Sequence, residues 1–519
     1  MTLNNNSGNS SWKESLVAFY HPRVITMLLL GVSAGIPLLL IFSSLSMWLV
    51  EAGVDRSAVT YFSWAALGYS FKFVWAPLVN SLKIPLLSQK LGRLRAWLLL
   101  SQLMIILSIS LMALIDPATN KLTTMAIAAV FLGFSSATQD IVIDAYRIES
   151  AEEKYQGLMS SSYIAGYRIG MLIAGAGALY LADFFGSTSN EYNYQAWQST
   201  YLVMALTMLV GVITTLVISE PDIEKRGATL TSTENSLRFF LLFCATVFVF
   251  IGCYFASAQL AVLLKEQLEQ LLSNTYLAAT VVELLRLTAA SIIAALIAKS
   301  LIAIGMVEQK QVYHAYIAPV KDFFDRYGIR LALTILALIG FYRVSDIVLG
   351  VISNVFYYEI GFKKTTIANV VKSFGLGMTI MGGFLGGMLT LRYGVMRILL
   401  AGAVLSALTN ILFIILAKSE QDLGLLYLVI AADNLSAGLA GAAFVAFLSS
   451  LTNISFTAMQ YAIFSSIMTL FPKVLGGYSG SIVEGIGYES FFLITALMGL
   501  PVLFLIFWVN RLLIARQSG

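Results

Sequence analysis

Residues 24 to 49 read VITMLLLGVSAGIPLLLIFSSLSMWL, without one charged side chain. About 20 apolar helical residues cross the hydrocarbon core of a bilayer, and this run exceeds that length. Backbone N–H and C=O groups in lipid must bond within the segment, and the run lacks the alternating pattern of a barrel strand. It therefore predicts a membrane-spanning α-helix, which Gly31, Gly35 and Pro37 are expected to bend.

Apolar runs of this kind recur along the chain, which has 519 residues, 58% of them hydrophobic and 12% charged. Soluble domains carry roughly 25% charged residues, so this composition indicates a membrane protein. We expect spans near 24–49, 58–80, 96–115, 122–143, 157–182, 197–219, 238–264, 276–304, 331–354, 366–389, 395–417, 423–450, 456–478 and 489–510. The predicted fold class is an all-α polytopic membrane helix bundle with about 14 transmembrane helices.

This pattern divides the chain into two six-helix halves with a two-helix insert between them. The predicted parts are an N-terminal tail (1–22), an N-terminal half (23–236), the insert (237–305), a connecting segment (306–330) and a C-terminal half (331–519). Most of the 32 Lys and Arg residues lie in loops on the side of the N-terminus, and such loops favour the cytoplasm. We therefore expect the tail, the connecting segment and both termini to be cytoplasmic.

Several classes of function are disfavoured by the residue inventory. The net charge of +4 is spread over the loops, so nucleic-acid binding is not expected. Cys244 and Cys253 lack the Cys-x-x-Cys spacing, and His21 and His314 lie outside the apolar runs, so we expect no disulfide framework, metal site, cofactor or catalytic residues. The polar stretches 220–236 and 305–330 are too short to fold alone as the soluble domain of a sensor.

Two carboxylates lie at the end of the fourth predicted span. Asp140 and Asp144 are four residues apart and therefore share one helical face, with Asp140 deeper in the bilayer. Charges inside a membrane usually mark a path for a solute or ion. Burial disfavours the ionised carboxylate and a nearby cation favours it, so both are candidates for proton coupling. The alternative for Asp144 is an interfacial ion pair with Arg147 that anchors the helix end.

Cations and further acids lie inside other spans of both halves. Lys72, Arg168, Arg343 and Lys372 are the predicted companions of Asp140, and they should favour an anionic solute. Alternatively, each cation neutralises a buried acid, as Arg343 could do for Asp346 three residues later. Asp346 and Asp433 are further candidates for proton coupling.

Polar and aromatic side chains lie close to these charges in the sequence. Aromatic rings with polar edges suit the faces of sugars, although Trp and Tyr also favour membrane interfaces. The predicted solute contacts of this kind are Gln139, Tyr69, Tyr167 and Trp75.

Six plus six spans with a cytoplasmic middle resemble the major facilitator superfamily, whose two halves rock around a midplane site. In that superfamily the loop after the second helix carries Gly-x-x-x-Asp-Arg-x-Gly-Arg-Arg. This chain keeps Gly92-Arg93-Leu94-Arg95 but has Asn80 and Ser81 where Asp and Arg are expected. The departure predicts a weakened charge relay in this loop.

Three motifs resemble the AmpG muropeptide permeases: Phe71 to Leu78, Gln139 to Ala145 and Gly166 to Leu172. Further similarity runs through Asp322 to Phe324, Asn434 to Gly441 and Phe444 to Tyr461. The resemblance implies a multi-pass protein of the bacterial inner membrane that imports anhydromuropeptides for peptidoglycan recycling and β-lactamase induction, driven by protons. The implied partners are an anionic glycopeptide, protons and the lipid bilayer, and we expect a monomer.

Other branches of this fold carry siderophores or acyl-coenzyme A esters, so import of another anionic cargo is the alternative function. A membrane sensor that transports nothing is a further, less favoured alternative. The insert is unexplained by the resemblance. Because six helices per half close the pathway, we expect residues 237–305 to pack outside the bundle or bridge the halves. Glu283 and Arg286, three apart on one helix, could then satisfy each other.

Overall fold

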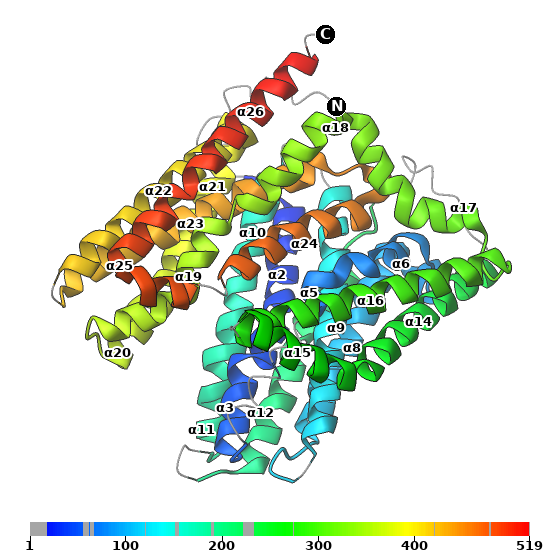
Figure 1. Ribbon diagram of the computed structural model, residues 1–519, viewed down its shortest axis with the longest axis horizontal. Coiled ribbons are helices and arrows are strands. Elements are labelled where there is room, and N and C mark those ends of the chain that lie inside the picture. The colour runs from blue at the N-terminus through cyan, green and yellow to red at the C-terminus, as the bar shows by residue number, and fades with distance from the viewer. Residues whose placement is uncertain are drawn as a thin grey trace. The chain divides into compact units, whose positions relative to one another are not determined.

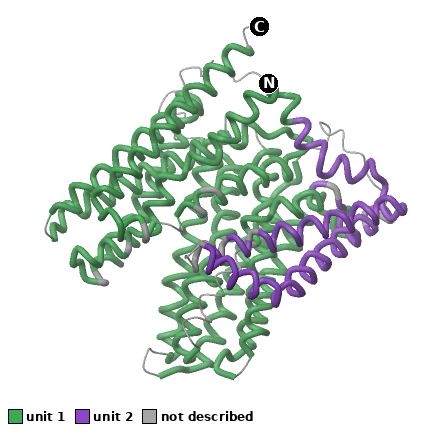
Figure 2. Tube along the Cα trace, in the orientation of Figure 1, with its two compact units in different colours: residues 1–79, 86–226, 323–519 green, residues 80–85, 227–322 purple. Residues whose placement is uncertain are grey.

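The computed structural model describes residues 18–54, 62, 67–119, 121–150, 155–187, 191–221, 233–272, 275–419, 421–476 and 479–517. These residues form helices joined by short loops (Figure 1). They fall into two compact units (Figure 2). Unit 1 comprises Met1–Val79, Leu86–Arg226 and Phe323–Gly519, and unit 2 comprises Asn80–Pro85 and Gly227–Asp322.

The first predicted span consists of α2 (Pro22–Ile41) and α3 (Ser43–Glu51), which meet at a break at Phe42. Pro37 lies in α2 and cannot donate a backbone hydrogen bond, which loosens the turn that precedes this break. Gly31 and Gly35 serve close packing, since a Cβ atom on them would lie 2.3 Å from the Tyr163 carbonyl oxygen and 2.0 Å from that of Tyr167. The bend therefore follows the proline, while the two glycines let α2 and α10 approach each other.

The remaining helices of the N-terminal half, called the N-half, follow in chain order. They are α5 (Leu67–Phe71), a 3₁₀ turn (Lys72–Val74), α6 (Ala76–Ser81), α7 (Leu87–Leu91), α8 (Arg93–Ala113), α9 (Leu122–Ser150), α10 (Gln156–Leu172), α11 (Ala178–Phe184), α12 (Tyr194–Thr207) and α13 (Leu209–Val217). One π-helical turn, Ile173–Gly177, joins α10 to α11.

The C-terminal half, called the C-half, begins with α18 (Ala318–Phe341), which is kinked at Gly328 where φ is 70°. It continues with α19 (Val344–Glu359), α20 (Lys364–Ile367), a π-helical turn (Ala368–Phe374), α21 (Gly375–Tyr393), α22 (Val395–Lys418), α23 (Leu423–Leu451), α24 (Thr457–Gly476), α25 (Ser479–Leu497) and α26 (Gly499–Gln517). Within unit 1, α10 packs on α21 and α23, while α24 packs on α5 and α9. These contacts join the two halves.

Unit 2 holds α14 (Thr233–Ala256), α15 (Ala258–Leu272), α16 (Thr275–Ala303) and the short α17 (Gln309–Val312). The predicted span 238–264 is interrupted at Ser257, whose hydroxyl accepts a 3.3 Å hydrogen bond from Arg286 Nε. Arg286 also donates to the Tyr254 carbonyl oxygen at 2.8 Å and pairs with Glu283 at 2.6 Å. The expected pair is therefore present, and its arginine ties α16 to the break between α14 and α15.

Twelve helices among the described residues are long and apolar enough to cross a membrane, two of them in unit 2. The predicted thirteenth span corresponds to a 3₁₀ turn (Ile454–Phe456) and α24, and the apolar stretch there, Ile454–Leu470, is shorter than a span. The predicted second span falls partly outside the described residues, so the count of fourteen stays a prediction. The all-α multi-pass fold is confirmed.

Candidate functional site

Helices of the N-half and the C-half pack tightly against each other at the end where α9 stops at Ser150 and α10 starts at Gln156. We call this end of the helices the closed end. All residues from 156 to 162 in α10 and from 457 to 462 in α24 are buried. Further along the same helices, Ile169, Leu172 and Leu470 are 38%, 48% and 44% exposed. The contact between the halves is therefore tight at the closed end and loosens towards the opposite end.

Glycines bring the backbones of α10 and α21 together at the closed end. A Cβ atom on Gly387 would lie 1.8 Å from Ser161 Oγ and 2.9 Å from the Gly157 carbonyl oxygen. A Cβ atom on Gly157 would lie 3.0 Å from Thr390 Cγ2. A larger residue at 387 would force the Ser161 side chain to move and would press against the backbone of α10 at Gly157.

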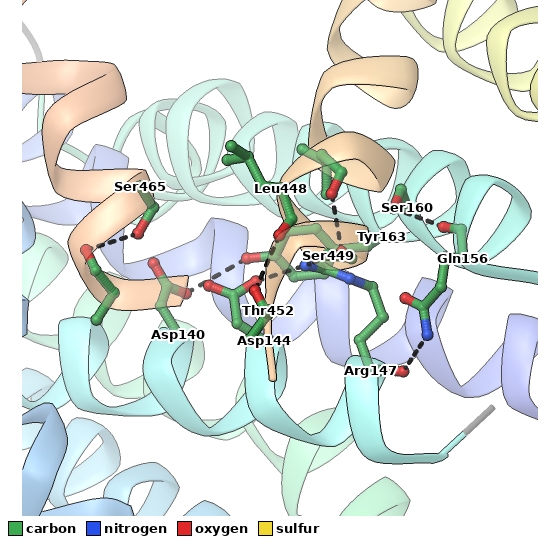
Figure 3. Close-up of polar contacts among 12 residues, drawn as sticks. Asp140, Asp144, Arg147, Gln156, Ser160, Tyr163, Leu448, Ser449, Thr452 and Ser465 are labelled. Carbon is green, nitrogen blue, oxygen red and sulfur yellow. Dashed lines mark hydrogen bonds and ion pairs between the residues drawn. The ribbon is translucent and has the colours of Figure 1, made fainter. Parts of the chain in front are cut away.

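A charge cluster lies beside this contact (Figure 3). The Asp144 carboxylate pairs with Lys72 Nζ at 3.4 Å and with Arg147 Nη1 at 3.0 Å. All three side chains are buried, at 9% exposure for Lys72 and Asp144 and 0% for Arg147. The alternative pairing of Asp144 with Arg147 is thus present, but within a buried cluster, because α24 covers this end of α9.

Asp140 lies one turn away from Asp144 on α9, and its carboxylate accepts a 3.4 Å hydrogen bond from the Tyr163 hydroxyl of α10 (Figure 3). It is 8% exposed and makes no ion pair with the residues that the structure describes. Lys72 and Asp144 are close enough to act on it electrostatically. Asp140 is therefore buried, and whether its carboxyl group is ionised depends on its neighbours.

Arg147 connects the cluster to the C-half, a contact that sequence reasoning missed. Its guanidinium donates to Ser449 Oγ of α23 at 3.3 Å and lies 4.9 Å from the centre of the Tyr461 ring of α24. The Tyr163 ring of α10 lies 6.0 Å away on the N-half side. No sequence signal marks this contact, because Ser449 is 302 residues from Arg147.

A second polar contact crosses the closed end at Glu149. Its carboxylate accepts hydrogen bonds from Arg93 Nη2 at 3.0 and 3.3 Å and one from the hydroxyl of Thr457 in the C-half. Arg93 also donates to the Val79 carbonyl oxygen at 3.1 Å. The retained part of the loop motif therefore acts through Arg93.

The C-half carries its own charge cluster. Arg343 Nε lies 3.2 Å from Asp346 Oδ2, as the spacing of three residues predicted, and Ser406 donates to the other carboxylate oxygen. Asp433 of α23 is close enough to interact electrostatically with both Asp346 and Arg343. Arg343 thus pairs with one acid and lies within electrostatic reach of a second.

Arg168 and Arg343 come together from different halves. A Cβ atom on Gly441 would lie 3.4 Å from Arg343 Nη1 and 3.8 Å from Ile164 Cδ1, which places the Arg343 guanidinium near α10 one turn before Arg168. The two arginines interact as like charges. Lys72 is the predicted cation that lies close enough to act on Asp140, so the expectation that all four cations accompany Asp140 stays a prediction.

The other predicted cations differ in their surroundings. Lys72 is held by Asp144, whereas Lys372 lies exposed in the π-helical turn of Ala368–Phe374. In the described part of the chain neither Lys372 nor Arg168 forms an ion pair, and Arg168 donates only to the Met171 sulfur at 3.8 Å. The cations that form no ion pair among the described residues thus lie away from the closed end, towards the opposite end of the helices.

Three of the polar and aromatic residues that we predicted to contact the solute instead form hydrogen bonds within the N-half. Tyr69 donates to Ser136 Oγ at 2.6 Å, and Trp75 Nε1 donates to Thr138 Oγ1 at 3.1 Å. Gln139 is fully buried and accepts a 3.1 Å hydrogen bond from Ser33, so it faces the helix core in this conformation. Tyr167 is half-buried beside Gly35.

Comparison with known proteins agrees with this architecture. The model of the Major Facilitator Superfamily matches residues 24–349. The E. coli fucose:proton symporter FucP has a similar fold, with a TM-score of 0.58 and 9% identity over 95% of this chain and 99% of that one.

Relatives by sequence extend over nearly the whole chain. A putative transporter AmpG 4 of Rickettsia conorii is 31% identical, covering 94% of this chain and 96% of the relative. The anhydromuropeptide permease of Escherichia coli K12 is 28% identical, covering 96% of this chain and 81% of the relative. The chain is therefore a multi-pass membrane transporter of the major facilitator superfamily, and within it belongs to the AmpG family of permeases.

Proposed function

We propose that this protein imports anhydromuropeptides released from the cell wall across the bacterial inner membrane, driven by the proton gradient, for peptidoglycan recycling. The observation that carries the proposal is the contrast between a closed end with paired charges and the cations Arg168 and Lys372, which have no acid partner among the residues that the structure describes. The E. coli relative is named an anhydromuropeptide permease, which supports the choice of cargo.

The cargo would present carboxylates and sugar faces to the two halves. Arg168 and Arg343 interact as like charges, and a bound carboxylate would add to the compensation that Asp346 already gives Arg343. Lys372 would supply a further contact, while Lys72 becomes available only when its pair with Asp144 breaks. Tyr69, Tyr167, Trp75 and Gln139 would contact sugars only after rearrangement of the N-half.

Protons would bind at the buried carboxylates. Asp140 is the first candidate, because it is buried without an ion pair among the described residues, and Asp144 adjoins it. In the C-half, Asp346 pairs with Arg343 and Asp433 lies within electrostatic reach of both, so one of the two acids would hold a proton at lower cost than a second negative charge.

Transport would proceed by alternating access, with the closed end on the cytoplasmic side together with both termini. This orientation follows the distribution of Lys and Arg among the loops. The present conformation would then be the one that receives cargo from the periplasm. The protein would act as a monomer, since the six spans predicted for each half would enclose a pathway within one chain.

The decisive experiment is uptake of labelled anhydromuropeptide into proteoliposomes with an imposed pH gradient. We expect accumulation that collapses when a protonophore is added, and weak competition from a siderophore or an acyl-coenzyme A ester. Strong competition by either compound, without uptake of the anhydromuropeptide, would replace the proposed cargo. No flux of any of these solutes would favour a sensor.

A further inference from the structure

We propose that Arg147 links the charge of Asp144 to the contact between the halves, so that neutralising Asp144 opens the closed end. Arg147 is a positioning residue in this proposal and touches no cargo. That a proton is the physiological trigger rests on the proposed function. The link itself is a property of the chain and can be measured without any cargo.

The first step is the burial of Arg147. Its side chain is 0% exposed, although an arginine is charged at every physiological pH. A buried charge is tolerated only where partners compensate for the lost hydration. Arg147 has one anionic partner among the described residues, Asp144 at 3.0 Å. The position of the guanidinium therefore depends on that carboxylate.

The second step is that Asp144 serves two cations at once. Its two oxygens face Arg147 Nη1 and Lys72 Nζ separately, at 3.0 and 3.4 Å. If Asp144 became neutral, both cations would remain buried in one place without their shared anion. Removing one partner of a buried ion pair is far more destabilising than replacing the whole pair.

The third step is that Arg147 contacts residues of the C-half, whereas Asp144 pairs with residues of the N-half. Its guanidinium donates to Ser449 and lies over the Tyr461 ring, both in the C-half. Lys72 and Asp144 belong to the N-half. A guanidinium released from Asp144 would thus lose its place between α9, α23 and α24, three of the helices that meet at the closed end.

The charged and titratable groups that face this pair come from three further elements besides α9. They are Lys72 of the 3₁₀ turn, Asp140 and Asp144 of α9, Tyr163 of α10 and Tyr461 of α24. Asp140 lies on the same helical face one turn away, so a proton could pass to Asp144 without crossing the contact between the halves. Protonation of Asp144 would favour opening, and its ionisation would favour closure.

The reporter for opening is a thiol placed inside the closed end. Ser160 is fully buried in α10, so Ser160→Cys in a chain with Cys244→Ser and Cys253→Ser should react slowly with N-ethylmaleimide. Asp144→Asn should raise the labelling rate about 10- to 150-fold, the equivalent of one lost charge-assisted contact. Labelling is measured on the full chain in proteoliposomes at fixed pH, without cargo.

A double-variant cycle tests the role of Arg147. In an Arg147→Met background there is no guanidinium to release, so adding Asp144→Asn should change labelling by less than about twofold. The conservative Arg147→Lys variant should keep the response to Asp144→Asn. The same increase in both backgrounds, or no increase in either, would overturn the proposal.

A milder pair of variants keeps the test valid if the charge variants misfold. Ser449→Ala removes the hydrogen-bond partner of Arg147 in the C-half and should raise labelling of Ser160→Cys severalfold. Ser450→Ala, whose hydroxyl bonds only its own helix at Phe447, should leave labelling unchanged. Equal labelling in the two variants would also overturn the proposal. Failure of muropeptide uptake with an intact cycle would reject the cargo alone.

Discussion

The closed end and the opposite end of the same helices handle charge in different ways. At the closed end, the buried cations Lys72 and Arg147 share the carboxylate of Asp144. Towards the opposite end, Arg168 and Lys372 have no ion-pair partner among the described residues. The protein thus pairs its cations with a carboxylate where the halves touch and leaves cations without an ion pair, among the described residues, where the halves separate. A bound anion would complete the charge balance at one end only.

The largest expected effect concerns Asp140, which lies beside the closed end and forms no ion pair within the described part of the chain. Asp140→Asn mimics the protonated carboxyl, so accumulation driven by a pH gradient should disappear while counterflow exchange persists. The measurement is uptake into proteoliposomes with and without the gradient.

The matched control is Asp183→Asn on the exposed part of α11, which should leave accumulation intact. If the Asp140→Asn protein still concentrates solute against a gradient, Asp140 is not a coupling residue.

Arg168 and Lys72 provide a direct test of the difference between the two ends. Arg168→Met should weaken cargo binding by about 1.5 to 3 kcal/mol, or roughly 10- to 150-fold, because one charge-assisted contact is lost. Lys72→Met should change affinity less, since Asp144 already neutralises that lysine. Binding is measured by titration calorimetry at constant pH. Equal losses of cargo affinity in the two variants would contradict the idea that cargo binds near Arg168 and not at the closed end.

Two glycines of α21 test whether close backbone packing holds the closed end together. Gly387→Ala places a methyl group within 1.8 Å of Ser161 Oγ, so closure should cost about 1 to 3 kcal/mol, or roughly 5- to 150-fold in population. Gly377→Ala, on the same helix but with nothing within 4 Å, is the control. The rate at which a thiol at position 160 is labelled reports closure. A similar rate for both variants would show that the glycine contact does not govern it.

The smallest effect is expected from the ion pair of unit 2. Glu283→Gln removes the charge that pairs with Arg286 and leaves the bonds of Arg286 to Ser257 and Tyr254 in place. Glu283 is 45% exposed, so any loss of stability should be small and uptake should change by less than about twofold. Cysteine labelling across 238–264 and 276–304 complements this measurement. Protection by cargo along a continuous helical face would show that the insert lines the pathway.

Hydropathy and local spacing determined much of the fold. The long apolar runs reappear as helices because a membrane span depends on composition within one segment. Pairs three residues apart, Arg343 with Asp346 and Glu283 with Arg286, were predictable because a helix fixes their distance. The break at Ser257 was not predicted, since Arg286 of another helix bonds there.

The sequence alone determined that the chain is an all-α membrane protein with intramembrane charges, and its motifs pointed to the AmpG family. Only the tertiary structure decided how those charges are paired. Lys72 meets Asp144 across 72 residues, Arg147 meets Ser449 across 302 and Glu149 meets Thr457 across 308. Which buried charges meet depends on how separate helices pack, and no local pattern in a chain encodes that packing.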